Sequence, residues 1–147
     1  MVSLKLIEPS AVIKNWHFFI DGFRKVLEYV DGDQTEDSIF NDLMSNRLSM
    51  QVIFNNDKYA GFVTGRFDFQ PNGDKNMFIN HMFIKDGSLP EIFKEVQMEM
   101  EKKAREVQCK RIVFLTNRDK GFDKKLREFG FKTRYVELVK EIGGQNG

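Results

Sequence analysis

The sequence lacks the features that mark several large classes of protein. It has one cysteine, Cys109, which excludes an intramolecular disulfide and a cysteine-rich zinc site. No apolar run approaches the roughly 18 residues that span a bilayer. The N-terminus lacks the basic segment and long apolar core of a signal peptide. The sequence therefore predicts a cytoplasmic protein that does not bind membranes.

A strong charge of either sign is missing too. The chain holds 23 Lys and Arg against 22 Asp and Glu, whereas general nucleic-acid binding calls for a basic excess. It contains no glycine-rich phosphate loop, His-Glu-x-x-His motif or nucleophile elbow. His17 has no acidic or histidine partner at metal-ligand spacing. We expect neither nucleic-acid binding nor a metal site.

Core-forming residues, in contrast, are abundant. The 147 residues are 41% hydrophobic and include fifteen Phe, which suits one domain that buries roughly two thirds of its unfolded surface. We expect that domain to cover residues 1–142. The last residues, 143–147, have nothing to bury, so we expect a mobile tail.

Apolar spacing predicts the secondary structure. The expected strands are Ser3–Ile7, Ser49–Phe54, Lys58–Phe69, Asn76–Lys85, Arg111–Thr116 and Phe131–Val139. The expected helices are Ala11–Val30, one that starts at a capping box of Asp33 and Glu36 and stops near Asn46, Ser88–Val107, and Phe122–Phe129. This order, β-α-α-β-β-β-α-β-α-β, predicts an α/β (α+β) domain with a mixed, mostly antiparallel sheet flanked by helices.

Several segments resemble one family. Tyr59–Val63 resembles the "G-x-hydrophobic" strand of the GNAT N-acetyltransferases, and Asn117–Phe131 resembles the ending in which Gly-Phe leads into the last strand. Trp16–Val26 and Gln108–Phe114 are similar to small GNAT-like proteins of tailed bacteriophages. The resemblance covers most of the chain. It implies the GNAT fold and, for active members, acetyl-CoA-dependent acylation of an amine.

The resemblance also implies where acyl-CoA would bind. The third strand of the central antiparallel series, Asn76–Lys85, and the loop after it would hold the thioester and the pyrophosphate of acyl-CoA. One further position would approach the adenine end of the cofactor. The residues at these positions are Phe83, Ile84, Lys85, Gly87, Ser88 and Asn117.

The loop itself departs from the family pattern of Gln/Arg-x-x-Gly-x-Gly/Ala, whose glycines expose backbone N–H groups to phosphate. Gly87 is the one glycine left, and Pro90 removes an N–H from the first helical turn. Asp86 and Glu91 add negative charge, and Ser88 with Glu91 matches a capping box. These residues favour an ordinary capped helix over a phosphate site.

The position of the family's general acid holds a leucine in this sequence. The family commonly has a Tyr four residues before the Gly of its Gly-Phe ending, where it can protonate the departing thiolate. Leu126 stands there, and its spacing from Phe129 assigns it to the core. Tyr135, in the last expected strand, is the substitute candidate, against an ordinary packing role.

The candidate general base is His81, because the family counterpart of its strand often carries one and histidine titrates near neutral pH. Alternation along the strand predicts an apolar face shared by His81, Met77, Ile79 and Phe83. That environment favours a hydrogen-bonded structural histidine as the competing interpretation.

Basic residues form two groups. Arg105, Lys110 and their neighbours alternate with glutamates, which favours a solvated helix face over phosphate binding. A denser group, Arg118 to Arg127, lies around the last helix, where an anion or an acidic partner surface is a further hypothesis.

Two functions remain. The altered loop and Leu126 favour a non-catalytic GNAT-like phage protein in the host cytoplasm, without a cofactor. Such a protein would be a virion structural or assembly component, or would bind a host protein. The alternative is an acetyl-CoA-dependent N-acyltransferase. The sequence leaves the oligomeric state open.

Overall fold

The computed structural model describes residues 1–28, 33–85, 90–114, 122–134 and 138–143. Within them a mixed five-stranded sheet has the strand order β1-β2-β3-β4-β5. The strands are β1 (Val2–Ile7), β2 (Ser49–Asn55), β3 (Lys58–Phe69), β4 (Lys75–Ile84) and β5 (Arg111–Phe114). The first four pair antiparallel, and β5 is parallel to β4. This arrangement confirms the mostly antiparallel α+β fold.

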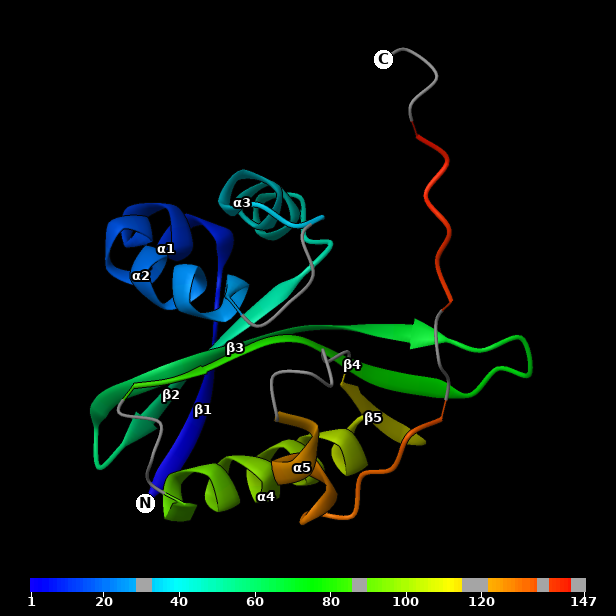
Figure 1. Cartoon of the computed structure of the whole chain (residues 1–147). Helices are drawn as coiled ribbons and strands as arrows, with labels where there is room; N and C mark the ends of the chain where they lie inside the picture. The colour runs from blue at the N-terminus through cyan, green and yellow to red at the C-terminus, as the bar shows by residue number, and fades with distance from the viewer. Residues whose placement is uncertain (29–32, 86–89, 115–121, 135–137, 144–147) are drawn as a thin grey trace.

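Helices cover both faces of the sheet (Figure 1). They are α1 (Pro9–Lys14), α2 (Trp16–Leu27), α3 (Glu36–Met44), α4 (Pro90–Glu106) and α5 (Phe122–Arg127). The first three lie on one face, and α4 lies on the other with α5 beside it. No helix in the described part of the chain is long and apolar enough to cross a membrane.

The first expected helix is divided in two. Asn15 leaves the helical conformation, with φ −114° and ψ 17°, and its side-chain amide donates to the Ala11 carbonyl. Such a side chain competes with the helical hydrogen bonds, so α1 ends and α2 starts here. The next cap also differs from the expectation, because Thr35 and Ser38 form the reciprocal capping box instead of Asp33 and Glu36.

The structure differs from the expectation at the last expected strand. The described residues of Phe131–Val139 carry no strand, and residues 138–143 extend away from the body of the protein (Figure 1). Leu138 is 92% exposed and Ile142 is 73% exposed. A strand is stable only when it pairs with a neighbour, which apolar and aromatic spacing cannot guarantee. The prediction was therefore wrong for these residues.

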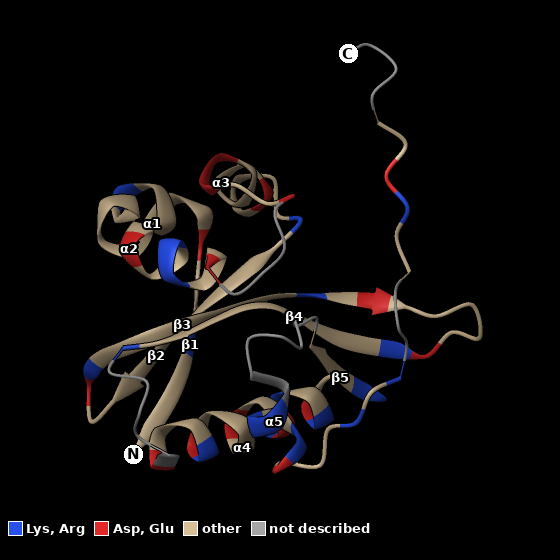
Figure 2. Cartoon of the chain, in the orientation of Figure 1, with Lys and Arg blue, Asp and Glu red and all other residues tan. Residues whose placement is uncertain are grey.

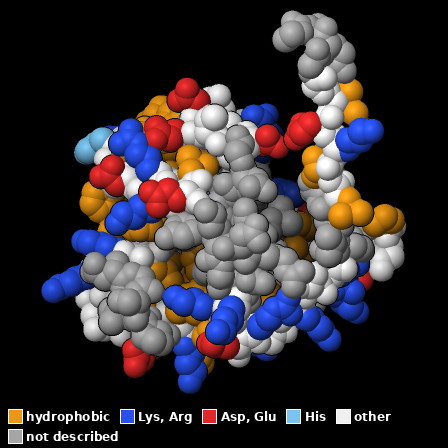
Figure 3. Space-filling view, in the orientation of Figure 1, with side chains coloured by type: hydrophobic (Ala, Val, Ile, Leu, Met, Phe, Trp, Pro, Cys, Tyr) orange, Lys and Arg blue, Asp and Glu red, His pale blue; other side chains and the backbone are white. Residues whose placement is uncertain are grey.

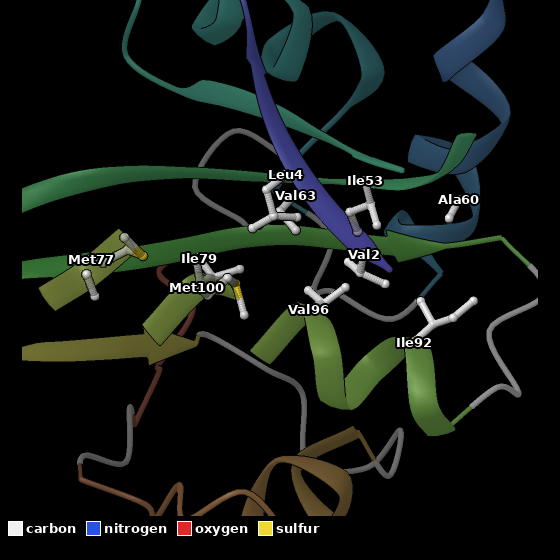
Figure 4. Packing of buried hydrophobic residues seen from close by; sticks show 11 residues of the cluster. Val2, Leu4, Ile53, Ala60, Val63, Met77, Ile79, Ile92, Val96 and Met100 are labelled. Atoms are coloured by element: carbon white, nitrogen blue, oxygen red, sulfur yellow. The ribbon is translucent and has the colours of Figure 1, made fainter. Parts of the chain in front are cut away.

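Two apolar cores hold the layers together. One lies between the sheet and α4, where Val2, Ile53 and Val96 meet (Figure 4). The other lies between the sheet and the N-terminal helices and is centred on aromatic residues such as Phe23 and Phe62. These two rings are 4.3 Å apart between centroids. Strand β4 contributes to both cores and so carries side chains to both faces of the sheet.

Candidate functional site

Strand β4 is longer than the described part of its neighbour β5. It pairs with β3 as far as Ile84, opposite Gly61. Among the described residues, its pairing with β5 covers Asn76–Ile79, where Phe114 is the last described residue of β5. Beyond Ile79, β4 therefore has β3 on one side and no strand of the described chain on the other. We call the part of β4 that has no described neighbour on this side, residues 80–84, the open edge.

Backbone polar groups point out of this open edge. The Lys85 N–H donates to the Ala60 carbonyl at 2.7 Å, so residue 85 faces β3. The Phe83 carbonyl also faces β3, because a Cβ built on Gly61 would lie 2.0 Å from its oxygen. Alternate residues of an antiparallel strand bond to opposite sides. The N–H and C=O groups of Met82 and Ile84 therefore face the opening.

This edge can accept an extended ligand as a strand accepts a neighbour. Main-chain donors and acceptors at every second residue bind extended amide-containing chains by strand addition. The close approach of β3 that keeps β4 in place requires glycine, since Gly61 has φ +149° and no room for a side chain. Gly65 also has a close neighbour, because a Cβ there would lie 2.4 Å from the Phe78 oxygen.

A β-bulge reverses the faces of β4 at this point. Thr64 pairs with His81 and the next residue, Gly65, pairs with Ile79, so Asn80 is an extra residue on β4. Before the bulge, Met77 and Ile79 belong to the core under α4. The predicted face shared by His81, Met77 and Ile79 is therefore wrong, because one inserted residue shifts the alternation.

After the bulge, His81 and Phe83 lie on the opposite face, toward α2. The part of the prediction that joined these two residues is correct. Met82 and Ile84 now pack against the core under α4 instead. At the open edge, Met82 and Ile84 therefore direct their backbone groups away from β3 and their side chains toward the core under α4.

The buried ring of His81 makes two polar contacts. Its Nδ1 lies 2.6 Å from the Thr64 Oγ1, and its Nε2 lies 2.6 Å from the Gln34 Oε1. With the amide oxygen of Gln34 as acceptor, Nε2 carries the proton and Nδ1 accepts from the hydroxyl of Thr64. Neither ring nitrogen is left to take a proton from an amine in this arrangement.

Burial also keeps His81 neutral. Its side chain is 2% exposed, and the loss of hydration lowers its pKa to about 4, although the charge of Asp42 acts in the opposite direction. The ring is uncharged at neutral pH. The geometry matches the structural interpretation of His81, while its role as a base stays a prediction.

Sequence reasoning missed both partners of His81. Gln34 precedes α3 in a segment without periodicity, and only the fold brings it to β4. Thr64 carried a usable signal. It is a hydroxyl residue within the apolar part of β3, is fully buried, and so must have a hydrogen-bond partner.

The loop before α4 is described only in part. The candidates Gly87 and Ser88 lie outside the described residues, as do Asn117 and Tyr135. Helix α4 starts at Pro90, which has no N–H to offer, and Glu91 is an acidic residue of its first turn.

The three remaining binding candidates are on or beside β4. Ile84 is on the open edge, Phe83 packs toward α2, and Lys85 is exposed just after the strand. In the described parts of the chain, no group of three or more His, Cys, Asp or Glu is placed to hold a metal ion.

Leu126 is a core residue, as its spacing predicted. It is 3% exposed on α5, and the Phe129 ring after it lies 5.1 Å from Phe93 of α4. Leucine has no proton to give. The position that holds the general acid in the family therefore anchors α5 instead.

This combination of a mostly antiparallel meander, a crossover helix and a strand parallel to β4 matches the fold of the GNAT acetyltransferases. One similar solved structure is a ribosomal-protein-alanine N-acetyltransferase from Brucella melitensis biovar Abortus. It has 16% identity and a TM-score of 0.73, over 97% of this chain and 100% of that one.

Two further structures agree. An aminoglycoside acetyltransferase from an uncultured soil metagenomic sample, in complex with sisomicin, has 11% identity and a TM-score of 0.69 over 97% of each chain. A predicted acetyltransferase with acetyl-CoA from Clostridium acetobutylicum has 12% identity and a TM-score of 0.65, over 95% of this chain and 96% of that one. No protein-family model matches the sequence, and no curated protein matches it significantly. At these identities the likeness shows the fold.

Proposed function

We propose that the protein is an acyl-CoA-dependent N-acyltransferase and that acyl-CoA binds along the open edge of β4. The observation that carries this proposal is the edge of β4 beyond Ile79, with which no described strand pairs on the side opposite β3. There the polar backbone groups of Met82 and Ile84 face away from β3. The likeness to an acetyltransferase structure with acetyl-CoA supports the proposal.

The open edge suits the arm that links the thioester of acyl-CoA to its phosphates. That arm is an extended chain with two amide groups, so it can exchange N–H···O=C bonds with Met82 and Ile84 as an added strand does. The side chains of these residues, packed partly on the core under α4, offer apolar contacts to its methylene groups. The thioester would then lie along β4, within reach of an amine.

The reaction needs little chemistry from the protein. The neutral amine attacks the thioester carbonyl, the tetrahedral intermediate collapses, and the C–S bond breaks with release of the CoA thiolate. The amine loses its proton to water, because both nitrogens of His81 are engaged with Thr64 and Gln34. Leu126 cannot donate a proton to the thiolate, so that proton comes from water or from Tyr135, the substitute candidate. Catalysis then rests on the positioning of the two reactants.

A non-catalytic function is the second candidate, favoured by Glu91 and Leu126. A carboxylate in the first turn of α4 repels a phosphate, and a buried leucine replaces the acid. Such a protein would bind a virion or host protein of a tailed bacteriophage in the host cytoplasm and would need no cofactor. Phage origin stays a prediction from the N-terminal segment.

Substitutions at Ile84 separate the two functions. The Ile84 N–H points away from β3, so Ile84→Pro removes it and leaves the β3–β4 ladder intact. The control Ile84→Val keeps the N–H. We expect acetyl-CoA to raise the Tm of the wild type and of Ile84→Val, with a much smaller rise for Ile84→Pro. Release of CoA in the presence of amines would then demonstrate turnover.

The opposite result is equally clear. If acetyl-CoA at about 1 mM leaves the Tm of the wild type unchanged, the enzyme proposal fails and the binding function takes its place. If Ile84→Pro binds as tightly as Ile84→Val, acyl-CoA binds elsewhere on the protein.

A further inference from the structure

A hollow lies at the N-terminal end of β4, opposite the open edge. It has a volume of about 500 Å³, within the range of small-molecule sites. The β3–β4 hairpin, the end of α4 and the start of β5 border it, and its wall includes Phe69, Asp74, Lys75, Arg105, Cys109 and Lys110. Lys75 and Ile84 mark the two ends of the strand, which puts the hollow about 30 Å from the end of the open edge.

Three cations from distant parts of the sequence meet here. Lys75 comes from β4, Arg105 from α4 and Lys110 from the residue before β5. The Lys110 N–H donates to the Lys75 carbonyl at 2.7 Å, which ties two of these segments together. Figure 2 shows basic residues at the starts of β4 and β5. The sequence interpretation of a solvated helix face did not include Lys75, which only the fold brings to the group.

Negative charge at the hollow is smaller and partly engaged. Asp74 is the one carboxylate named in its wall, and its Oδ2 accepts from the Asn72 amide at 3.1 Å. The carbonyls of Ala104 and Arg105, at the negative end of α4, already accept backbone N–H groups of Cys109 and Gln108. The exposed pair of Arg105 and Glu101, 3.8 Å apart, is a weak competitor for the cation. The balance of charge is positive.

The wall also has an apolar side. Phe69 is 67% exposed at the end of β3, so part of its ring is free to cover a ligand. The Lys75 Nζ lies 5.1 Å from the centre of the Phe67 ring, a cation–π contact that holds the ammonium group at the hairpin. Cys109 adds a partly buried thiol. The hollow therefore offers positive charge beside an apolar surface.

We propose that this hollow binds a small polyanion, a phosphorylated or polycarboxylated metabolite, between Lys75, Arg105 and Lys110. Two or more negative charges match the three cations, and Phe69 covers the carbon skeleton of the ligand. The site does not rest on the proposed acyltransferase function, because it shares no residue with the open edge of β4.

Cys109 makes the site directly testable, since it is the only cysteine of the chain. Iodoacetamide modifies that one thiol, and the mass of the intact protein reports the rate. Burial raises the pKa of the thiol, while nearby Lys75 lowers it, so each variant is compared with itself, with and without anion. We expect sodium pyrophosphate or citrate, at constant ionic strength, to slow the modification saturably by about fivefold or more.

Two double variants with equal charge complete the experiment. Lys75→Gln with Lys110→Gln should lose the protection, and Lys58→Gln with Lys94→Gln, at exposed sites elsewhere, should keep it. Protection by pyrophosphate alone assigns a phosphorylated ligand, and protection by citrate alone assigns a polycarboxylate. The proposal is overturned if neither anion protects Cys109, or if both double variants are protected equally.

Discussion

The two ends of β4 differ in charge and in pairing. At its C-terminal end the strand has an unpaired edge, a neutral buried histidine, and the acidic Glu91 at the start of α4. At its N-terminal end the strand pairs on both sides and meets Lys75, Arg105 and Lys110. Figure 3 shows Lys and Arg side chains gathered along the lower part of the molecule, over α4, α5 and β5.

Acyl-CoA has an extended amide-containing arm and a phosphate-bearing nucleotide. The groups that would bind these two parts lie at opposite ends of β4. Strand addition to β4 needs open backbone groups, which the C-terminal end of the strand provides. Phosphate binding needs positive charge, which the opposite end provides. The positive end of the α4 dipole points toward the open edge, yet Glu91 opposes it there. We infer that the acyl arm dominates acyl-CoA binding and that the phosphates contribute little.

The largest expected effect comes from Gly61→Ala, which disrupts β3–β4 pairing at the C-terminal end of β4. The new Cβ would lie 2.0 Å from the Phe83 oxygen at a φ of +149°, so strands β3 and β4 must separate. We expect the free energy of unfolding to fall by about 3 kcal/mol or more, with loss of acetyl-CoA binding. Urea unfolding measures the first and calorimetry the second.

Gly73→Ala is the matched control at the other end. Gly73 has φ +90°, but a Cβ there meets nothing within 4 Å. We expect a cost of about 1 kcal/mol from the backbone conformation alone, and unchanged acetyl-CoA binding. Equal losses in the two variants would show that β3 and β4 do not approach as closely as described.

A second prediction concerns the neutral histidine. The folded pKa of His81, about 4, lies below its unfolded value near 6.5. The unfolded chain therefore binds the proton first as the pH falls, and stability decreases from about pH 6.5 and continues to decrease down to about pH 4. We expect this histidine to remove about 3 kcal/mol over that interval.

The pH dependence of unfolding in two variants isolates this contribution. His81→Asn should have a shallower slope between pH 6.5 and 4 than His17→Asn, in which an exposed histidine is replaced. Identical slopes would mean that His81 is solvated and available as a base.

A third, smaller prediction sharpens the difference in charge. Glu91→Gln removes the carboxylate from the first turn of α4, and we expect acetyl-CoA to bind about threefold more tightly. Glu95→Gln, exposed one turn farther along, should change the affinity less. Calorimetry on both variants decides the point, and weaker binding by Glu91→Gln would show that Glu91 assists the ligand.

The smallest expected effect is at the far end of α4. Arg105→Gln removes a cation from the hollow, but α4 separates it from the open edge by about 25 Å, beyond the screening length of about 8 Å. We expect the Kd for acetyl-CoA to stay within about twofold of the wild-type value. A larger loss would place the phosphates of acyl-CoA in the hollow.

Local signals in the sequence predicted much of this architecture. The apolar spacing predicted the helix that became α4, whose buried side chains include Val96 and Met100, and it assigned Leu126 to the core. It also predicted strands β2 and β3, which Asn56 and Asp57 join as a two-residue loop with positive φ values. Each of these features depends on residues close together in the chain.

The features that decide the chemistry depend on distant residues. A bulge at Asn80 moves His81 to the other face, and alternation alone cannot reveal it. The contact with Gln34 spans 47 residues of sequence. Lys75 joins Arg105 and Lys110 only because β4 and β5 pair. The fold was therefore easier to predict than the site.

The most direct measurement is amide hydrogen exchange along β4 with and without acetyl-CoA. The outward N–H groups of Met82 and Ile84 should exchange quickly in the free protein and slow down when acetyl-CoA is added, with no change at Asn76–Ile79. Unchanged exchange at Met82 and Ile84 with about 1 mM acetyl-CoA would contradict strand addition at the open edge.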